Sequence, residues 1–235
     1  YAFDPDLTFY VNIDYNTVSE SQIQLLMGWG SYHFGRALTV NAGLGKVPGT
    51  WEWLETSRYT LGADRTMATT FFRPSMTAGI WADGELSEGL FYRALVGNGF
   101  NTFTLRAGEL DTNLAYSGIM WWEPLGDFGV GFSDLEDHQH LVVRTGQAFT
   151  YTKNDGDTTG EPGPEQTVVR LSDGTRLVEP GALAPGVTVN EFDISLYAIH
   201  FGMKYRGLSF STEYFLRWLT SIKGTGPLPI DSLFD

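Results

Sequence analysis

Histidine and carboxylate side chains are the residues of this chain that could hold a metal ion or move a proton. His138 and His140 lie two positions apart, and residues at that spacing in a strand share a face, so they offer two zinc ligands. No third ligand is evident, and turn histidines are the favoured interpretation. The polar run 154–161 carries ligand oxygens, but its spacing does not match an EF-hand loop. We therefore predict no metal ion and no cofactor.

Groups for covalent catalysis are scarce as well. The chain has no cysteine, which excludes thiol catalysis, thiolate metal sites and disulfides. It also has no Gly-x-Ser-x-Gly sequence of the kind that presents a hydrolytic serine. A formal net charge of −13 argues against a nucleic-acid partner, because phosphate binding requires clustered Lys and Arg. The sequence predicts a protein that is not an enzyme and binds no nucleic acid.

The elements that would position a site are predicted to be β-strands. The 28 glycines are too many for a helical protein of this size, but they suit a sheet with tight turns. Apolar runs are far shorter than the ~20 residues that a membrane-spanning helix needs. Apolar and polar residues alternate with a period of two, as in strands with one apolar face. The expected strands are 7–14, 22–30, 38–44, 76–83, 90–97, 113–122, 139–152, 191–204 and 208–219.

The connections between these strands alternate in length. Short turns are expected near 34–37, 84–89 and 205–207, with a medium one opening at 124–129. Long connections are expected at 45–75, 98–112 and 153–190. Tight turns at one end and long loops at the other are typical of an up-and-down transmembrane barrel, with the long loops external. We predict an all-β fold in which residues 1–235 belong to one antiparallel β-barrel domain.

The two faces of the strands fit this architecture. The polar members carry little charge near mid-strand, as expected if they line an aqueous lumen while the apolar members meet lipid. In the run 22–30, Ile23, Leu25, Met27 and Trp29 should share the apolar face. Trp81 and other aromatics near strand ends would form interface girdles. The predicted strand number is odd, whereas single-chain bacterial barrels have an even number, so we expect part of a larger barrel.

Several segments resemble the phosphate-selective porin family, the outer-membrane porins of O and P type. The longest is GLGKVPGTWE at 43–52, which continues through SRY at 57–59 and DR at 64–65 to FRP at 72–74. The family pattern has a strand that ends in Gly-x-x-Lys-x-Pro, then a Glu, a serine-containing pair, an acidic-Arg pair and an Arg. WEPLGDFG at 122–129 and GPLPIDSLF at 226–234 also resemble family segments.

The resemblance implies a sixteen-stranded, homotrimeric porin of the bacterial outer membrane, in contact with outer-membrane lipid. It implies that the long loop 45–75 folds into the pore and narrows it, and that 153–190 is external. Constriction residues would then be Lys46, Arg58, Arg65, Arg73, Glu52, Glu55 and Asp64. The other candidates for the lumen are Arg93, Arg106, Arg144, Glu213 and Arg217. The loop has a local charge of about +1, which favours anions in a narrow channel.

The solute and the role stay open in three respects. The chain has only 15 Lys and Arg, so phosphate itself is not singled out among small anions and other small polar solutes. Salt bridges from the loop arginines to Glu52, Glu55 and Asp64 could pin the loop to the wall instead of forming a constriction. A soluble β-sandwich or barrel that binds carbohydrate, with Trp51, Trp53, Trp121 or Trp122 as stacking platforms, is the alternative fold. A barrel that anchors the envelope is the alternative role.

Overall fold

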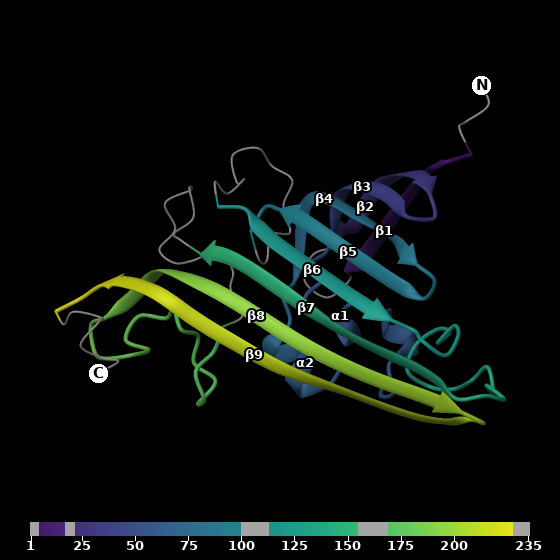
Figure 1. Cartoon of the computed structure of the whole chain (residues 1–235). Helices are drawn as coiled ribbons and strands as arrows, with labels where there is room; N and C mark the ends of the chain where they lie inside the picture. Colours follow the sequence, from purple (N-terminus) through teal and green to yellow (C-terminus); the bar gives the residue numbers. More distant parts are fainter. Residues whose placement is uncertain (1–4, 17–21, 100–112, 155–168, 228–235) are drawn as a thin grey trace.

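A computed structural model describes residues 5–16, 22–99, 113–154 and 169–227 of the protein. Nine β-strands dominate it (Figure 1). Their bounds are β1 Leu7–Asn16, β2 Gln22–Gly35, β3 Leu38–Lys46, β4 Met76–Ser87, β5 Leu90–Gly97, β6 Ala115–Trp122, β7 Val142–Asn154, β8 Thr188–Tyr205 and β9 Leu208–Thr225. All nine strands predicted from the alternation are confirmed. β8 and β9 are longer than the alternation indicated.

The strands pair in chain order. Each is antiparallel to the next, which gives a single up-and-down sheet with β1 and β9 at its edges. In the described part of the chain these two edge strands do not pair with each other, so the sheet is open. The all-β, antiparallel, up-and-down fold is therefore confirmed, and closure into a barrel is not seen in these strands.

The two ends of the sheet differ in their connections. At the tight-turn end lie the turns 36–37, 88–89 and 206–207, together with the longer connection 123–141. Arg206 and Gly207 have positive φ angles of 48° and 76°, as the two-residue turn of a twisted hairpin requires. At the long-loop end lie the connections 47–75, 98–114 and 155–187. The alternation of connection lengths seen in the sequence is thus an alternation between the two ends of the sheet.

The connection 47–75, which we name the inserted segment, packs against one face of the sheet. We refer to this face as the inner face and to the opposite one as the outer face. Figure 1 shows the helices of the inserted segment behind the sheet; they are α1 Trp51–Leu54, the 3-10 helix η1 Ser57–Tyr59 and α2 Met67–Phe72. Thr50 and Thr66 cap α1 and α2 by accepting backbone N–H groups. Among the described residues, no helix is long and apolar enough to cross a membrane.

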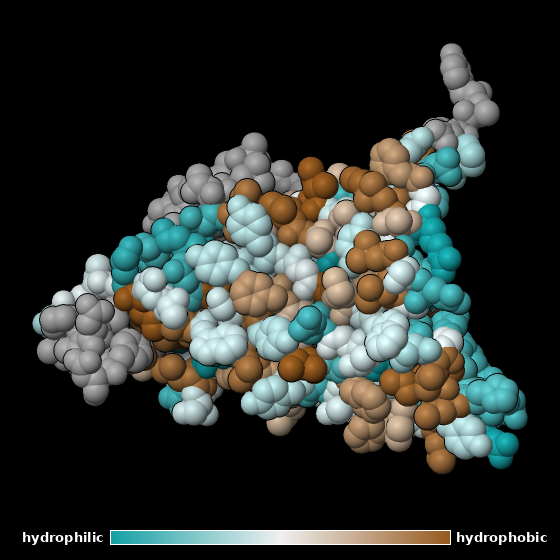
Figure 2. Space-filling view, viewed as in Figure 1, coloured by the Kyte–Doolittle hydropathy of each residue, from teal (hydrophilic) through white to brown (hydrophobic). Residues whose placement is uncertain are grey.

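The outer face carries large apolar side chains that are open to the surroundings. Ile80 is 61% exposed, Phe210 is 51% exposed and Tyr214 is 62% exposed. The strand register places on the same face the exposed residues Phe9, Val11, Val96, Tyr116, Met120, Trp122, Phe149, Ile199, Phe201, Met203 and Trp218. Figure 2 views this face, where brown and pale residues fill the middle and strongly hydrophilic residues lie toward the sides. Exposed apolar side chains gathered on one face are typical of sites that contact another protein or a membrane.

Two expectations about strand faces are wrong. In β2, a register irregularity opposite Asn12 and Ile13 separates Leu25, which pairs with Ile13 on the outer face, from Met27, which pairs with Asn12. Trp29 therefore points inward, where it stacks on Tyr10 at 4.2 Å between ring centroids. Trp81 also lies on the inner face and is 5% exposed, so it belongs to no outer girdle. A single inserted residue exchanges the two faces of a strand, and alternation alone does not reveal it.

Three apolar clusters cover the inner face from β6 to β9. The first joins Trp51 to the connection 123–141, the second joins Leu54 to the middle of the strands, and the third joins residues 169–187 to the long-loop end of β8 and β9. Their buried members are Trp51, Phe128, Phe132 and Val142; Ile119, Ala148 and Ala198; and Val169, Leu177, Val187, Val189, Phe192 and Ile194. As a result, all inner-face residues of β8 between Phe192 and Lys204 are buried.

Candidate functional site

Three cationic side chains surround one tryptophan on the inner face. Lys46 ends β3, Arg65 precedes α2 and Arg73 follows it, so residues far apart in the chain meet here. Around the ring centroid of Trp53, the Lys46 Nζ lies at 5.0 Å, the Arg65 guanidinium carbon at 4.9 Å and that of Arg73 at 3.9 Å. Each such cation–π contact is worth about 0.5–2 kcal/mol, depending on how far water is excluded. We name this group the Trp53 cluster.

Neutral acceptors hold the cations of the Trp53 cluster in place. The Lys46 Nζ donates to the carbonyl oxygens of Leu54 at 3.2 Å and Glu55 at 2.9 Å. Arg65 donates to the carbonyl oxygens of Glu52 at 3.3 Å and Glu55 at 3.0 Å. Carbonyl groups fix the position of a cation without cancelling its charge. The cluster therefore brings three cationic side chains together without placing a carboxylate among these acceptors.

The acidic residues of the inserted segment do not neutralise this charge. In the described part of the chain, no ion pair joins a carboxylate to a cation of the Trp53 cluster. The carboxylate of Glu52 instead accepts from the backbone N–H of Thr66 at 3.0 Å and its hydroxyl at 2.7 Å. Asp64 is exposed and accepts from the adjacent Arg65 N–H at 2.8 Å. Salt bridges from the loop arginines to these carboxylates were one alternative for holding the segment. The carboxylates of Glu52 and Asp64 instead accept hydrogen bonds from other groups of the inserted segment.

Electrostatics in the cluster favour an anion. Burial, and then repulsion from Arg65, lower the pKa of the Arg73 guanidinium from its ordinary value. An arginine stays charged at any physiological pH, so the shift reflects how unfavourable the like charges are together. A small anion that reached these side chains would relieve the repulsion. The arrangement can therefore bind or concentrate anions.

The remaining constriction candidates add no charged side chain to the contacts described for the cluster. Arg58 is exposed in η1, and its guanidinium carbon lies 5.8 Å from the ring centroid of the adjacent Tyr59. Glu55 is half-buried and contributes its carbonyl oxygen to the cluster, as described for Lys46 and Arg65. Of the seven residues predicted for a constriction, the fold thus brings together Lys46, Arg65 and Arg73, and it leaves Arg58 and Asp64 on the exposed part of the segment.

Arg93 is the lumen candidate that lies on a polar part of the inner face. Its Nε is 3.3 Å from a carboxylate oxygen of Asp83 on the neighbouring strand. That oxygen also accepts from Asn41 at 3.1 Å, and Asn41 accepts from the Ser31 hydroxyl at 2.5 Å. Side chains from β2 to β5 thus form one polar row beside the inserted segment. The sequence did not single out Ser31, Asn41 or Asp83, because each looked like an ordinary polar member of an alternating strand.

The other lumen candidates have mainly structural contacts. Arg144 lies between the rings of Trp51 and Trp121, with its guanidinium carbon 4.7 Å and 4.6 Å from their centroids. It is 4.0 Å from Glu123, whose pKa is raised by burial despite this neighbour. Glu213 and Arg217 lie on the inner face of β9 and bond the inserted segment. Arg106 falls outside the described residues.

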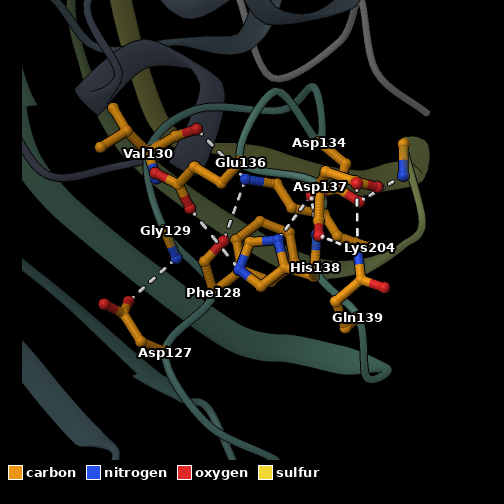
Figure 3. A network of polar contacts seen from close by, with 11 residues as sticks. Asp127, Phe128, Gly129, Val130, Asp134, Glu136, Asp137, His138, Gln139 and Lys204 are labelled. Carbon is orange, nitrogen blue, oxygen red and sulfur yellow. Dashed lines mark hydrogen bonds and ion pairs between the residues drawn. The ribbon is translucent and has the colours of Figure 1, made fainter.

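The acidic connection 123–141 is packed rather than fully solvated. Figure 3 shows its polar contacts at the tight-turn end. Asp134 is buried and accepts from His138 Nδ1 at 2.5 Å, from the His138 backbone N–H at 3.2 Å and from the Gly207 N–H at 2.8 Å. Burial raises the pKa of Asp134, but these hydrogen bonds outweigh it and hold the pKa below its ordinary value. Lys204 donates to the carbonyl oxygens of Phe128 and Val130 at 2.9 Å and 3.1 Å.

This network fixes a loop to the wall and is not a metal site. Within the residues that the structure describes, no three His, Asp or Glu side chains are arranged to hold a metal ion. Comparison with protein-family models, with curated proteins and with solved structures finds no match to the chain. The functional argument therefore rests on the Trp53 cluster, the polar row and the apolar outer face.

Proposed function

We propose that this protein is an outer-membrane porin, a passive diffusion channel for small hydrophilic solutes that prefers anions. The observation that carries the proposal is the contrast between the two faces of the sheet. The outer face exposes apolar side chains such as Ile80 and Phe210, whereas the inner face carries the three cations of the Trp53 cluster, which form no ion pair with a carboxylate among the described residues. A soluble barrel would bury its apolar side chains inside and expose the polar ones.

The outer face supports contact with lipid. In a bilayer every polar group must find a partner within the protein, because lipid tails offer none. One polar pair on this face meets that condition: the Tyr197 hydroxyl donates to Gln147 Oε1 at 2.6 Å. The long antiparallel ladders from β3 to β9 pair the backbone in the same way, with register irregularities near the ends of β4–β5 and β8–β9. We take the nine strands to be an arc of wall whose apolar side faces the membrane.

The open edges of the sheet bear on the architecture. The outward backbone groups of β1 and β9 have no partner strand in the described sheet, and each such group costs several kcal/mol in lipid. We therefore propose that the arc is completed into a closed barrel by further strands. The sixteen-stranded, trimeric form of that barrel follows from the sequence resemblance alone, as does the bacterial outer membrane as its location.

The inserted segment supports the preference for anions. A narrow channel lined by low-dielectric walls focuses the field of fixed charges, so three clustered cations raise the local anion concentration. Chloride, phosphate and small carboxylates would all respond to this field. The proposal therefore names small anions as a class, with phosphate as one member.

The carbohydrate-binding alternative is not favoured by the tryptophans. Stacking on a sugar requires an open aromatic face, and Trp51 and Trp53 are only 1% and 4% exposed. Trp122 is 50% exposed, but it lies on the apolar outer face. An anchoring role in the envelope is compatible with the same barrel and would concern the loops instead of the lumen.

The test is electrical. The protein is reconstituted in a planar bilayer, and the reversal potential is measured under a salt gradient. We expect discrete conductance steps with anion preference, and a lower preference in Arg65→Gln and in Arg73→Gln. Arg58→Gln is the matched control, since it removes the same charge from the same segment but outside the Trp53 cluster.

The outcomes separate the parts of the proposal. No conductance at all would reject the porin and leave the soluble and anchoring alternatives. Conductance without anion preference, or an equal effect of all three substitutions, would retain the pore and reject the Trp53 cluster as its selective part. Arg65→Lys, which keeps the charge, should retain most of the preference.

A further inference from the structure

One strand holds the beginning of the inserted segment. The Glu213 side chain on β9 accepts from the backbone N–H of Trp51 at 2.7 Å through Oε1, and from that of Glu52 at 3.0 Å through Oε2. Both N–H groups belong to the first turn of α1, where helical N–H groups lack intrahelical partners. Both oxygens of the carboxylate are thus used to fix the start of the segment.

The same strand also holds the end of the segment. Arg217 NH1 donates to the carbonyl oxygen of Phe71 at 2.8 Å, and its guanidinium carbon lies 4.5 Å and 5.1 Å from the ring centroids of Phe71 and Phe72. Between the two anchors, Phe215 stacks on Phe72 with ring centroids 5.4 Å apart and planes at 6°. Residues 213, 215 and 217 alternate along β9, so all three project from its inner face.

These contacts span the sheet. The inserted segment leaves from β3 and returns to β4, yet its anchors are on β9, five strands beyond β4. Neighbouring strands lie about 4.8 Å apart, so the segment reaches roughly 24 Å across the inner face, measured along the sheet. A segment held only at β3 and β4 would be free to swing. Together with the packing of Trp51 and Leu54 in the apolar clusters, the β9 anchors turn it into a fixed bridge across the space in front of the sheet.

Each anchor is coupled to one part of the Trp53 cluster. Glu213 holds α1, which contains Trp53, and Arg217 holds the end of α2, directly before Arg73. Loss of either anchor would therefore move the ring relative to the cations that lie on it. Neither anchor needs to touch a passing ion to affect it.

We propose that Glu213 and Arg217 are positioning residues that hold the inserted segment across the channel, and thereby set its narrowest width and its anion preference. This inference rests on the proposed porin function. It predicts an effect of Glu213 that is opposite to the effect of its charge. Removing a carboxylate from the lumen side would by electrostatics alone raise anion preference, whereas releasing the segment lowers it.

The experiment compares single channels of the wild-type protein with those of Glu213→Gln. The amide accepts one N–H but presents its own NH₂ group to the other, so the double anchor is lost at nearly constant volume. We expect the anion-to-cation permeability ratio to fall by about two- to tenfold, the factor that an ordinary hydrogen bond is worth in an equilibrium. We also expect larger open-channel noise and added subconductance levels, because the segment then samples several positions.

Controls separate positioning from charge. Ser211→Ala lies on the same face of β9 and should leave ratio and noise unchanged. Arg217→Gln should raise the noise, and Arg217→Lys should restore the wild-type record because an ammonium group can still donate to the Phe71 carbonyl oxygen. If Glu213→Gln does not insert into the bilayer, Glu213→Asp carries the test, since it keeps the charge and shortens the reach by one methylene; it should raise the noise at constant charge.

The result that overturns the inference is a Glu213→Gln channel with wild-type noise and an unchanged or higher anion preference. An Arg217→Lys channel as noisy as Arg217→Gln would count against the Phe71 anchor in the same way. These failures differ from failure of the porin proposal, in which the wild-type protein itself conducts no current.

Discussion

The inner face of β8 and the inner face of β2 and β3 belong to one sheet but have different surroundings. On β8, every inner residue from Phe192 to Lys204 is buried beneath the inserted segment and the connections 123–141 and 169–187. On β2 and β3, Ser31, His33 and Thr39 keep part of their surface open. We refer to the covered inner face of β6 to β8 as the sealed wall, and to the partly exposed inner face of β2 to β5 as the open wall.

The difference comes from where the connections lie, and in the proposed channel it would locate the water-filled path. Three separate connections place Trp51, Phe128 and Val187 on the sealed wall, and their apolar side chains exclude water there. The open wall carries the partly exposed residues Ser31, Asp83 and Arg93 of the polar row, which are linked through the buried Asn41. Solutes should therefore pass along β2 to β5 and beside the Trp53 cluster.

The largest expected effect is on thiol accessibility, and the absence of native cysteine makes it easy to measure. Ser31→Cys and Thr39→Cys on the open wall should react with a charged methanethiosulfonate reagent and lose current. Ala148→Cys and Ala198→Cys, at positions that are 2% and 0% exposed, should keep their current after the same treatment. Loss of current in Ala198→Cys after this treatment would show that water and reagent reach the sealed wall. The two walls would then not differ in accessibility.

The next largest effect is on stability, because substitutions on the sealed wall should lower the free energy of unfolding more than substitutions on the open wall. Trp51→Ala removes the centre of an apolar cluster on the sealed wall and should cost about 3–5 kcal/mol in the free energy of unfolding, measured by urea titration in lipid vesicles. Asn41→Ala breaks hydrogen bonds in the polar row on the open wall and should cost about 1–3 kcal/mol. Equal losses at the two sites would mean that the walls contribute alike.

A smaller effect is expected from adding a methyl group to the sealed wall. A Cβ at Gly202 would lie 2.7 Å from the Trp51 ring and 2.9 Å from the Phe128 ring, so Gly202→Ala overpacks the first cluster. We expect a loss of about 1–3 kcal/mol in the same titration. Gly118→Ala, whose Cβ has its nearest neighbour at 3.7 Å on the outer face, is the matched control and should be nearly neutral. An unchanged free energy of unfolding in Gly202→Ala would show that the side chains of this cluster move aside to accommodate the added methyl group.

The smallest effect concerns pH at the tight-turn end of the sealed wall. The folded-state pKa of Asp134 lies below its unfolded value of 3.8, so its contribution to stability is present above about pH 4 and is lost as pH falls through the folded pKa. Asp134→Asn lacks this contribution at every pH. The wild-type protein should be more stable than the variant at pH 7, and the gap should close below pH 4. If the difference in stability between the wild-type protein and Asp134→Asn did not change with pH, the contribution of Asp134 would come from its shape and not from its charge.

Much of the fold could be read from the residues. Alternation along the nine strands and the spacing of turns such as 206–207 were enough to predict an antiparallel up-and-down sheet. The period of a strand is local, so nearby residues carry it. The face of Trp29 could not be predicted, because an irregularity opposite Asn12 and Ile13 exchanges the faces, and no local pattern marks it.

The site was predictable only in part. The sequence indicated that Lys46, Arg65 and Arg73 belong to one long connection between two strands, and the resemblance to phosphate-selective porins implied that this connection folds inward. It did not indicate that all three lie on Trp53, nor that Arg144 is buried between two other tryptophans. Both arrangements depend on how the segment lies against strands that follow it by many residues.

The sequence by itself determined the strands, their order and which connections are long, since these follow from short-range alternation and turn chemistry. Only the tertiary structure decided which wall of the sheet is sealed and where the cations gather. Those outcomes depend on contacts such as Glu213 with Trp51, between residues 162 positions apart. Packing and hydrogen bonding between such distant residues leave no periodic trace in the chain.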